Sequence, residues 1–545
     1  MMNPTIRVLT TLALGWALCL NLSGCSAGES TTPTTSTPTG SGGVTGGGPV
    51  AVVDDPLFSQ QWHLENTGQD GGTAGEDARV VGVWNQDIGG RGVRIAVVDD
   101  GLEIGHEDLV PNVIPGQSHN YLTNGSDPTP ISTGTCREAG GSADCHGTAV
   151  AGVAAAFANK VGGRGVSPQA NLVGYNLLAS GVISPDSLEA DAMTRNAVTV
   201  WVSNNSWGAP DDGRLHPSGP LWKTGVLSGL SGGRNGLGTI YVWAGGNGGP
   251  RRGDNSNYEG YANFRGVIAV CAVNAAGRQP PYSDPGANLW VCAPSNTVGP
   301  GFPLPGITTT DRSGSQGYNT GGSSGEAVNA GYTTQFGGTS AATAVVSGVA
   351  ALILQANPNL GWRDVRWVLA ETARQNDAGD ADWTLNGAGF HVNHKYGFGT
   401  VDAETAVTRA RTWTNLGPQR TFSRTLAPSL ALADAGTTTN TVAISASGIS
   451  RIEWIEIEVT LSHPNDGELE IVLRNETTGT TSVLAEPRTC AGSGIDLCGN
   501  YDGWIFGSAR HLGEGTDGNW TLQIRDASSG LTGTLTSWKL TFYGT

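Results

Sequence analysis

The stretch VRIAVVDDG, residues 93–101, is a short apolar run that ends on two aspartates and a glycine. Similar runs recur in ANLVGYNLL, residues 170–178, and in GTIYVWAGG, residues 238–246, with helical stretches such as GTAVAGVAAAFAN, residues 147–159, among them. Apolar strands that alternate with helices are typical of a mostly parallel sheet covered by helices on both faces. We therefore expect an α/β domain over residues 54–414.

The hydrophobic pattern changes beyond residue 415. In IEWIEIEVTLSH, residues 452–463, apolar residues alternate with glutamate and threonine, which is the period of a half-buried strand. The segments GELEIVLRN, NWTLQIRD and SWKLTFYG repeat the pattern between Gly, Asn and Asp turns. A separate all-β sandwich is predicted for residues 415–545.

The first 25 residues, MMNPTIRVLTTLALGWALCLNLSGC, carry one charged residue, Arg7, before an apolar run. The run is short, so it indicates an export signal rather than a membrane span. Its ending, LSGC, resembles a bacterial lipoprotein box with Cys25 as the lipidated residue; an ordinary signal peptide is the alternative. Residues 26–53 are rich in Ser, Thr, Gly and Pro and predict a flexible tether. We expect an exported protein, lipid-anchored to a bacterial outer membrane or cell surface, with release to the extracellular space as a further option.

Charge and cysteine content agree with an exported protein. The formal net charge of −17 argues against a nucleic-acid partner. Of eight cysteines, Cys19 would leave with the signal and Cys25 would carry lipid, which leaves six for an oxidising compartment. The simplest of the fifteen possible pairings joins sequence neighbours: Cys136 with Cys145, Cys271 with Cys292, and Cys490 with Cys498.

Three polar residues lie where an α/β sheet would expose them. Asp99 ends an apolar strand, His146 precedes the helix in DCHGTAVAG, and Ser340 follows two glycines in GGTSAATA. Alone, each has a plain structural role as a turn, a cap or a helix N-cap. Together they supply the nucleophile, base and orienting carboxylate that acyl transfer needs. Asn247 in VWAGGNGG offers a side-chain amide for an oxyanion hole.

Five motifs, VVDDG, CHGTAVAG, NNSWG, AGGNGG and GGTSAA, together resemble the subtilisin-like serine proteases. Further segments are similar to the kexin and furin (proprotein convertase) branch, and the closing LTSWKLTFYGT resembles its jelly-roll-like P or homo-B domain. The resemblance implies that Asp99, His146 and Ser340 form the catalytic triad. It also implies that Asn247 completes the oxyanion hole.

The branch cuts after basic pairs, so the resemblance implies an acidic substrate cleft. Glu259 falls at the pocket for the residue before the cut, and Asp100 at the position facing the second basic residue. Asp211 and Glu189 fall at further acidic subsites. Taken singly, each of these residues is more typical of a solvated surface acid. Their joint placement favours the substrate cleft for Asp100, Asp211 and Glu259, and leaves the two interpretations of Glu189 equal.

The resemblance also implies calcium, which prefers oxygen ligands from carboxylates, amides and peptide carbonyls. The segment FANKVGG, residues 157–163, is similar to a calcium loop of the family. The implied first site contains Asp55, Asp108, Phe157, Asn159, Val161 and Gly163. The implied second site contains Asp211, Asp254 and Asp284.

We therefore expect a calcium-dependent serine endopeptidase that cleaves proteins or peptides after basic residues, with dibasic sites preferred. The alternatives are a broad-specificity degradative subtilase and a catalytically inactive surface adhesin. Only the tether separates Cys25 from the catalytic part, where the family typically has a longer propeptide. Folding unaided or with a separate chaperone protein is the expectation, and a monomer is expected.

Overall fold

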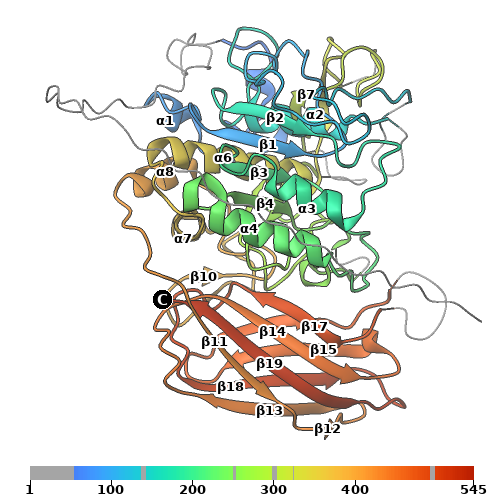
Figure 1. The fold of residues 1–545 in the computed structure, drawn as a ribbon, viewed down its shortest axis with the longest axis vertical. Helices are drawn as coiled ribbons and strands as arrows, with labels where there is room; N and C mark the ends of the chain where they lie inside the picture. Colours follow the sequence, from blue (N-terminus) through green and yellow to red (C-terminus); the bar gives the residue numbers. More distant parts are fainter. Residues whose placement is uncertain are drawn as a thin grey trace, which may run out of the picture. The chain divides into compact units, whose positions relative to one another are not determined.

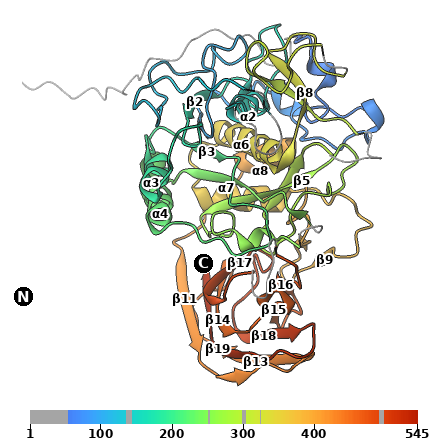
Figure 2. The ribbon, with the colours of Figure 1, turned by 90° about the vertical axis from the view of Figure 1, so that its right-hand side faces the viewer.

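The computed structural model of the chain describes residues 54–134, 136, 143–249, 253–297, 304–322, 325–490 and 498–545 (Figure 1). The predicted signal segment, Cys25 and the tether lie outside these residues. By their contacts, the described residues form one compact unit. Within this unit, an α/β part is followed by a part made of β-strands (Figures 1 and 2).

A six-stranded sheet forms the centre of the α/β part, in the order β2-β1-β3-β4-β5-β6, and all its pairs are parallel. Its strands are β1 Arg94–Val98, β2 Asn171–Tyr175, β3 Val202–Asn205, β4 Ile240–Ala244, β5 Val267–Val273 and β6 Val291–Pro294. Two short antiparallel pairs accompany it: β7 Ile307–Thr310 with β8 Tyr332–Phe336, and β9 Thr384–Leu385 with β10 His391–Val392. The prediction of a parallel sheet is confirmed.

Helices cover both faces of this sheet, as Figures 1 and 2 show. The helices are α1 Val81–Trp84, α2 His146–Ala155, α3 Asp186–Thr194, α4 Pro220–Gly236, α6 Gly338–Ala356, α7 Trp362–Thr372 and α8 Ala403–Arg411, with 3-10 turns η2 Phe58–Gln60, η3 Gln69–Gly71, η4 Ser256–Tyr258 and η5 Asp466–Glu468. Along β4, Ile240 and Val242 pack in the core that contains α2 and α6, whereas Tyr241 and Trp243 pack in the core that contains α3 and α4. Both sides of the strand are therefore apolar, as in the sequence.

Helix α6 is the central helix of the α/β part and contacts strands β3, β4, β5 and β6. It is long and apolar enough to span a membrane by composition, with a mean hydropathy of 1.6 over its most apolar window. However, 89% of that window is buried inside the fold. The small residues of α6 therefore serve close packing on the sheet.

The C-terminal part is a sandwich of two antiparallel sheets. One sheet has the order β11-β19-β14-β17 with β12 beside β19, and the other has the order β13-β18-β15-β16. The strands are β11 Arg420–Leu426, β12 Leu430–Ala431, β13 Thr437–Ile444, β14 Ile452–Ser462, β15 Leu469–Asn475, β16 Thr481–Ala485, β17 Asp502–Ser508, β18 Gly518–Asp526 and β19 Thr534–Gly544. Ile455, Ile457 and Val459 of β14 are fully buried in the sandwich core. The alternation seen in the sequence thus marks the inward face, and the predicted β-sandwich is confirmed.

All three predicted disulfides are present: Cys136–Cys145, Cys271–Cys292 and Cys490–Cys498. The second of them joins residues that lie directly opposite each other on the neighbouring strands β5 and β6. Pairing between sequence neighbours therefore holds for all six cysteines.

The sandwich and the α/β part share buried contacts. The side chain of Asn257 accepts from the backbone N–H of Gly507 at 2.7 Å and donates to the carbonyl of the same residue at 3.0 Å. Arg488 donates from Nε to the Gly213 carbonyl at 2.6 Å and places its guanidinium 4.0 Å from the ring centre of Tyr258. Two segments of the α/β part are thus fixed by residues of the sandwich.

Replacing Asn257 by Ala removes both hydrogen bonds to Gly507 and leaves two buried backbone groups unpaired. Each such group costs about 1–3 kcal/mol, so the variant should lose roughly 2–6 kcal/mol of unfolding free energy in urea titrations. The exposed Asn359, whose side chain makes no hydrogen bond among the described residues, is the matched control, and Asn359→Ala should change stability by less than about 0.5 kcal/mol. Equal stability of the two variants would contradict the coupling between the two parts.

Candidate active site

Asp99 and His146 meet at the carboxyl end of β1. Asp99 directly follows the strand, His146 is the first residue of α2, and Nδ1 of His146 lies 2.9 Å from Oδ1 of Asp99. The helix comes this close because residue 147 is glycine: a Cβ there would lie 2.0 Å from the carbonyl oxygen of Gly101 and 2.8 Å from Cβ of Asp99. The sequence therefore sets the aspartate against the ring through a position that only glycine can fill.

The electrostatics of this pair favour the imidazolium form. Burial lowers the pKa of His146, but the charge and hydrogen bond of Asp99 outweigh it and raise the pKa to about 9. The charge of Asp100 raises it further. Asp99 and Asp100 therefore stabilise the imidazolium that forms whenever this ring accepts a proton.

Ser340 is the third residue of α6, where the backbone N–H groups of the first turn have no partner within the helix. Its side chain is largely buried, at 8% exposure. The hydroxyl donates to the carbonyl of Ser206 at 3.1 Å, and the Ser206 hydroxyl donates to the carbonyl of Ser340 at 3.0 Å. The ring of His146 contacts that of Phe336, which ends β8 just before α6. Among the described residues, no hydrogen bond joins the Ser340 hydroxyl to His146 in the observed rotamer.

Asn247 lies beside the start of α6. Its Oδ1 accepts from the backbone N–H of Thr339 at 2.8 Å and from the Thr339 hydroxyl at 3.0 Å. This fixes the orientation of the amide, so that Nδ2 remains available as a donor on an exposed side chain. A Cβ at Gly338, which has φ +72°, would lie 3.4 Å from Asn247 Oδ1 and 3.8 Å from Ser340 Oγ. The space next to Ser340 is therefore kept open by a glycine and faces an amide.

Asp100 has a structural role that the sequence did not predict. One carboxylate oxygen accepts from the backbone N–H groups of Cys145 at 2.9 Å and His146 at 3.0 Å, and the other accepts from Gly147 at 2.8 Å. Burial and then the charge of Asp99 raise the pKa of Asp100 to about 7. Asp100 caps the helix that carries His146, and its expected contact with a basic substrate residue stays a prediction.

Three of the predicted acidic residues gather in one cluster. Carboxylate oxygens of Asp211, Glu259 and Asp284 all lie within 4.8 Å of one another. Burial, followed by the charges of Asp211 and Asp254, raises the pKa of Glu259 well above its usual value. Burial, followed by the charge of Asp254, does the same for Asp284, and burial raises the pKa of Asp254 to about 6. We call Asp211, Asp254, Glu259 and Asp284 the acidic cluster.

The acidic cluster fits a calcium ion. Oδ2 of Asp284 is buried and accepts no hydrogen bond among the described residues. A Cβ at Gly246 would lie 2.0 Å from this oxygen, so a glycine leaves room for it. Asp211 also accepts from the backbone N–H of Asn247 at 2.8 Å, which links the cluster to the residue beside Ser340. Four carboxylates, of which Asp254, Glu259 and Asp284 have raised pKa values, provide the hard oxygen ligands that calcium prefers.

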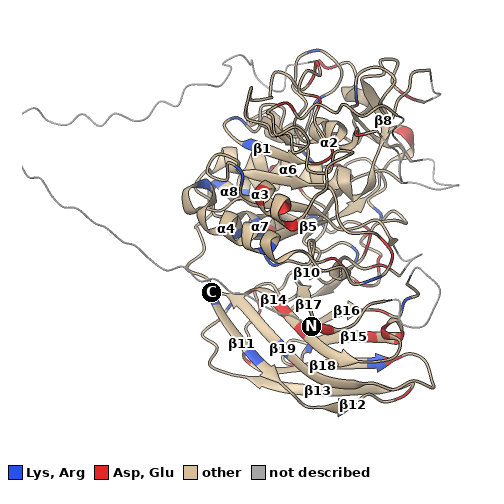
Figure 3. Cartoon of the chain, turned by 45° about the vertical axis from the view of Figure 1, so that its right-hand side comes forward, with Lys and Arg blue, Asp and Glu red and all other residues tan. Residues whose placement is uncertain are grey.

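Glu259 lies under the segment that follows β3. Its Oε2 accepts from the backbone N–H of Ala209 at 3.3 Å, and a Cβ at Gly208 would lie 2.3 Å from the same oxygen. Glu189, on α3, lies elsewhere: its Oε2 accepts from the hydroxyl of Tyr261 at 2.9 Å. Figure 3 shows acidic residues on α3. The structure brings Glu259 into the acidic cluster and does not bring Glu189 there.

The predicted first calcium site has a mixed set of donors. Oδ1 of Asp108 is buried without a hydrogen bond among the described residues, and burial raises the pKa of Asp108 to about 7. Asn159 accepts from the backbone N–H of Val161, at 2.8 Å. Within the described part of the chain, no hydrogen bond reaches the peptide oxygens of Phe157, Val161 or Gly163. These donors fit a calcium ion.

Asp55 has a different partner from the one expected. Its Oδ2 accepts from Nε of Arg164 at 2.7 Å, and its Oδ1 accepts from the backbone N–H groups of Asn159 and Lys160. The side chains of Asp55 and Arg164 are 0% and 3% exposed. A cation of the protein itself therefore neutralises Asp55, and this carboxylate is the poorest fit to an ion.

Sequence reasoning missed three residues of this region. Ser206 lies in the quoted motif NNSWG, but its contact with Ser340 depends on the order of the strands. Arg164 lies in the glycine-rich run GGRG, and the only sign of its role there is that a charged residue interrupts the glycines. Arg488 lies far away in the sequence from Gly213, and nothing in its own segment indicates the contact.

Comparison with known proteins gives the family. Residues 90–399 match the Subtilase family, and residues 452–542 match the Proprotein convertase P-domain. The chain belongs to the subtilase family of serine proteases. It is 33% identical over 507 residues to human proprotein convertase subtilisin/kexin type 7, covering 90% of this chain and 60% of that protein. It is 31% identical over 500 residues to protease KEX1 of Kluyveromyces lactis, covering 90% and 61%. The chain thus spans about three fifths of the length of these relatives.

Among solved structures, this subtilase is similar to the serine protease of Aeromonas sobria, with a TM-score of 0.81 and 27% identity over 94% of this chain and all of that one. The same Aeromonas protease in complex with a chaperone gives a TM-score of 0.79 at 27% identity, covering 90% and 95%. The fold and the order of the two domains are shared with these proteins.

The capping role of Asp100 predicts an effect on His146. Because the charge of Asp100 raises the pKa of His146, Asp100→Asn should lower that pKa, as measured by NMR titration of histidine-labelled protein. Glu103→Gln is the control, since the Glu103 carboxylate accepts from Ser313 N–H and does not face the ring. An unchanged or raised pKa of His146 in Asp100→Asn would contradict this assignment of charges.

Proposed function

We propose that this subtilase is a serine endopeptidase in which Ser340 is the nucleophile, His146 the general base and Asp99 the carboxylate that orients it. The observation that carries the proposal is the hydrogen bond between Asp99 and His146, next to a helix whose first turn holds Ser340. His146 takes the proton of the Ser340 hydroxyl as the hydroxyl attacks the peptide carbonyl, and returns it to the leaving amine. Asp99 stabilises the imidazolium between these steps.

The oxyanion of this reaction would be held by Asn247 and by backbone N–H groups at the start of α6. Oδ1 of Asn247 is already committed to Thr339, so Nδ2 is the group that can donate to developing charge. The open position at Gly338 supports the same assignment, because any side chain there would enter the space between Asn247 and Ser340.

We further infer a preference for basic residues before the cut, with dibasic sites favoured. The support is the acidic cluster, in which Asp211 bonds to the backbone of Asn247 and Glu259 lies under residues 208–209. A buried carboxylate with a raised pKa gains most from a cationic partner, and Arg offers a bidentate one. The similarity to proteins named proprotein convertases points the same way.

Calcium binding is part of the proposal. The residues that would hold it are Asp211, Asp254 and Asp284 at one site, and Asp108, Asn159 and peptide oxygens of residues 157–163 at the other. A bound divalent ion supplies positive charge that cancels the repulsion among buried carboxylates. In the acidic cluster, this leaves Glu259 free to face a substrate cation.

The cellular setting is proposed from the sequence. An exported lipoprotein anchored through Cys25 to a bacterial membrane agrees with the three disulfides, which need an oxidising compartment. The similarity to a protease solved together with a chaperone supports the idea that a separate protein assists folding. We expect a monomer.

The triad predicts covalent labelling at a single hydroxyl. A fluorophosphonate should label the full chain, and Ser340→Ala should abolish labelling and lower peptide hydrolysis at least ~10⁴-fold. Ser206→Ala is the control, because Ser206 contacts Ser340 yet is not assigned as nucleophile. Failure to label the unmodified chain would support an inactive scaffold that acts as an adhesin.

The acidic cluster predicts the specificity. Peptides that end in Arg-Arg or Lys-Arg before the leaving group should be cleaved faster than those ending in Ala-Phe. Glu259→Gln should reduce kcat/KM for the basic peptides roughly 30- to 1000-fold, the value of one buried charge pair, and should leave Ala-Phe cleavage unchanged. Faster cleavage of Ala-Phe by the unmodified enzyme would instead favour a broad degradative protease.

The stabilisation of the chain by calcium should depend strongly on Asp284. At a free calcium concentration 100 times the dissociation constant, the ion should stabilise the unmodified chain by about 2.7 kcal/mol. Asp284→Asn should be more stable than the unmodified chain in a chelator, since it removes one repelling charge, and should respond less to calcium. Asp311→Asn, at a buried aspartate outside the cluster, should lose equal stability with and without calcium. Equal calcium responses of the two variants would contradict the site.

A further inference from the structure

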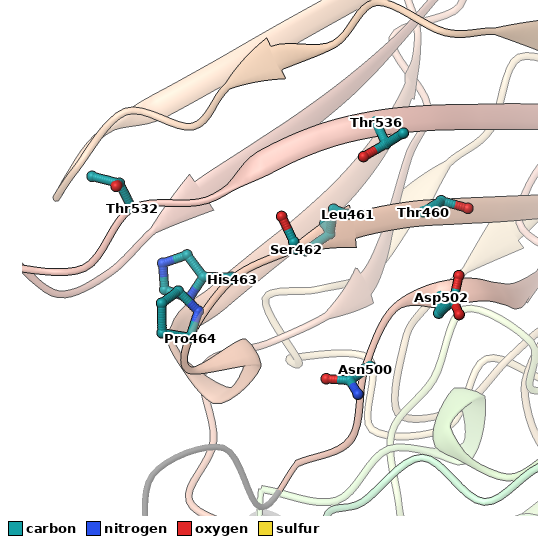
Figure 4. A pocket seen from close by; sticks show the side chains of 9 residues that line it. All are labelled: Thr460, Leu461, Ser462, His463, Pro464, Asn500, Asp502, Thr532 and Thr536. Atoms are coloured by element: carbon teal, nitrogen blue, oxygen red, sulfur yellow. The ribbon is translucent and has the colours of Figure 1, made fainter.

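Three ionisable side chains meet at one end of the β-sandwich, far along the chain from the catalytic residues. His463 follows β14, Glu468 ends η5, and Asp526 ends β18. One ligand atom from each lies within 4.8 Å of the others. The side chains of His463 and Asp526 are 0% and 1% exposed. Figure 4 shows His463 at the end of β14, beside Pro464.

The inward atoms of these three side chains lack hydrogen bonds. His463 Nε2, Glu468 Oε2 and Asp526 Oδ2 are all buried and make none among the described residues, and Nε2 and Oδ2 lie 3.3 Å apart. Leaving three converging polar atoms unpaired is costly, and a structure that does so has a reason for it. The missing partner would be a group that contacts all three atoms.

Another buried histidine of the same sandwich shows the difference. His511 places Nδ1 2.9 Å from Glu514 Oε2 and Nε2 3.1 Å from the hydroxyl of Ser482. Both ring nitrogens are therefore satisfied by the protein. At His463, only the outward nitrogen, Nδ1, is satisfied by the protein.

The outward atoms of the cluster are all held in place. His463 Nδ1 lies 2.8 Å from the carbonyl oxygen of Asn465 and 3.1 Å from its backbone nitrogen, and the shorter contact, to an acceptor, favours the proton on Nδ1 and a lone pair on Nε2. The side chain of Asn465 donates to Glu468 Oε1 at 2.9 Å, and the backbone N–H of Ser528 donates to Asp526 Oδ1 at 3.1 Å. A histidine ring fixed through its far nitrogen, and carboxylates bonded through their outer oxygens, are the supports typical of metal ligands.

The loop before β19 closes against the same ring. A Cβ at Gly533 would lie 2.9 Å from Cδ2 of His463 and 2.2 Å from the carbonyl oxygen of Ser462. Only glycine therefore permits this close approach, which further limits the orientation of the imidazole.

The charges call for a cation. In the described part of the chain, no lysine or arginine forms an ion pair with His463, Glu468 or Asp526. Arg525, next to Asp526, pairs with Glu470 at 2.6 Å instead. A ring with a free lone pair and two carboxylates, one buried and one half-buried, suit a divalent ion that would balance their charge.

We propose that His463, Glu468 and Asp526 bind a zinc ion. One imidazole nitrogen and two carboxylate oxygens suit zinc better than calcium, which prefers oxygen alone. Tetrahedral zinc with bonds of about 2.0–2.1 Å separates its ligand atoms by about 3.3–3.4 Å. The distance between Nε2 and Oδ2 is 3.3 Å.

A hollow of about 460 Å³ lies on one side of His463. Its lining includes His463, Asn500, Asp502 and Thr532 (Figure 4). A fourth ligand, such as water, would complete the tetrahedral coordination of zinc. The bound ion fastens the η5 turn to the end of β18, and the carbonyl of Gly467 in that turn accepts from the backbone of Arg488 at 2.7 Å. Zinc therefore stiffens the region of the sandwich that contacts the α/β part.

The test measures zinc on the full chain carrying Ser340→Ala, with calcium present to keep the calcium sites filled. After chelation and re-addition of ZnCl₂, elemental analysis and calorimetry compare Asp526→Asn with Asp502→Asn. The control makes the same chemical change at an exposed residue that lines the same hollow. Asp526→Asn should hold one zinc equivalent fewer, with at least ~100-fold weaker binding, beyond the 10–100-fold cost typical of residues that only support a ligand. Any zinc bound by His146 would be present in the same amount in the two variants and would not affect the comparison.

A second measurement uses the unmutated sandwich. Zinc should slow amide hydrogen exchange in residues 463–468 and 526–528 of the Ser340→Ala chain, and leave the segment around His511 unchanged. Equal zinc content and affinity in Asp526→Asn and Asp502→Asn would overturn the proposal. Hydrogen exchange that does not change with zinc would also overturn it, and would make His463 an imidazolium that pairs with Asp526 alone. Displacement of the zinc by millimolar calcium would overturn it as well.

Discussion

Repulsion among the buried carboxylates of the acidic cluster is the constraint on which the rest of this structure depends. Asp211, Glu259 and Asp284 come within 4.8 Å of one another, and their segments follow different strands of the sheet. Left alone, such segments would move apart. Arg488 of the sandwich opposes this displacement, because it binds the carbonyl of Gly213 and covers the ring of Tyr258, which are near neighbours of Asp211 and Glu259 in the sequence. The sandwich is therefore linked to the acidic cluster that we propose for substrate binding.

The same argument explains why the two parts form one compact unit. Asn257 and Tyr258, at the start of the segment that leads to Glu259, both contact residues of the sandwich. Asp211 also accepts from the backbone N–H of Asn247, which lies beside Ser340. Displacement of the segment that contains Asp211 or of the one that contains Glu259 would therefore also disturb Asn247. Stability of the sandwich contact and placement of the proposed oxyanion donor are thus physically linked.

How much the sequence could predict depends on whether a feature is local. The parallel sheet, the β-sandwich and the three disulfides were predicted, because periodicity and cysteine spacing are local signals. The meeting of Asp99 and His146 was also predicted, since both lie in motifs at the ends of regular elements. The role of Asp100 as a helix cap was not predicted, because the sequence beside Asp99 does not indicate which backbone N–H groups will donate to the Asp100 carboxylate. Arg164, Arg488 and the pairing of His463 with Asp526 were missed because each acts across more than twenty residues of sequence.

Buried negative charge is balanced in three different ways within this chain. Asp55 is paired with Arg164, whose guanidinium also lies over the rings of Phe58 and Trp84. Such a pair needs no ion, but it fixes the charge permanently and leaves no room for a ligand. Among the described residues, no arginine forms an ion pair with Asp254, Glu259 or Asp284 of the acidic cluster, and we propose that a calcium ion and a substrate cation share these carboxylates. The His463 cluster adds an imidazole nitrogen to two carboxylates, and this changes the selectivity from a hard ion to a borderline one. The choice among arginine, oxygen-only and mixed ligands therefore decides whether a buried acid serves stability, substrate binding or metal binding.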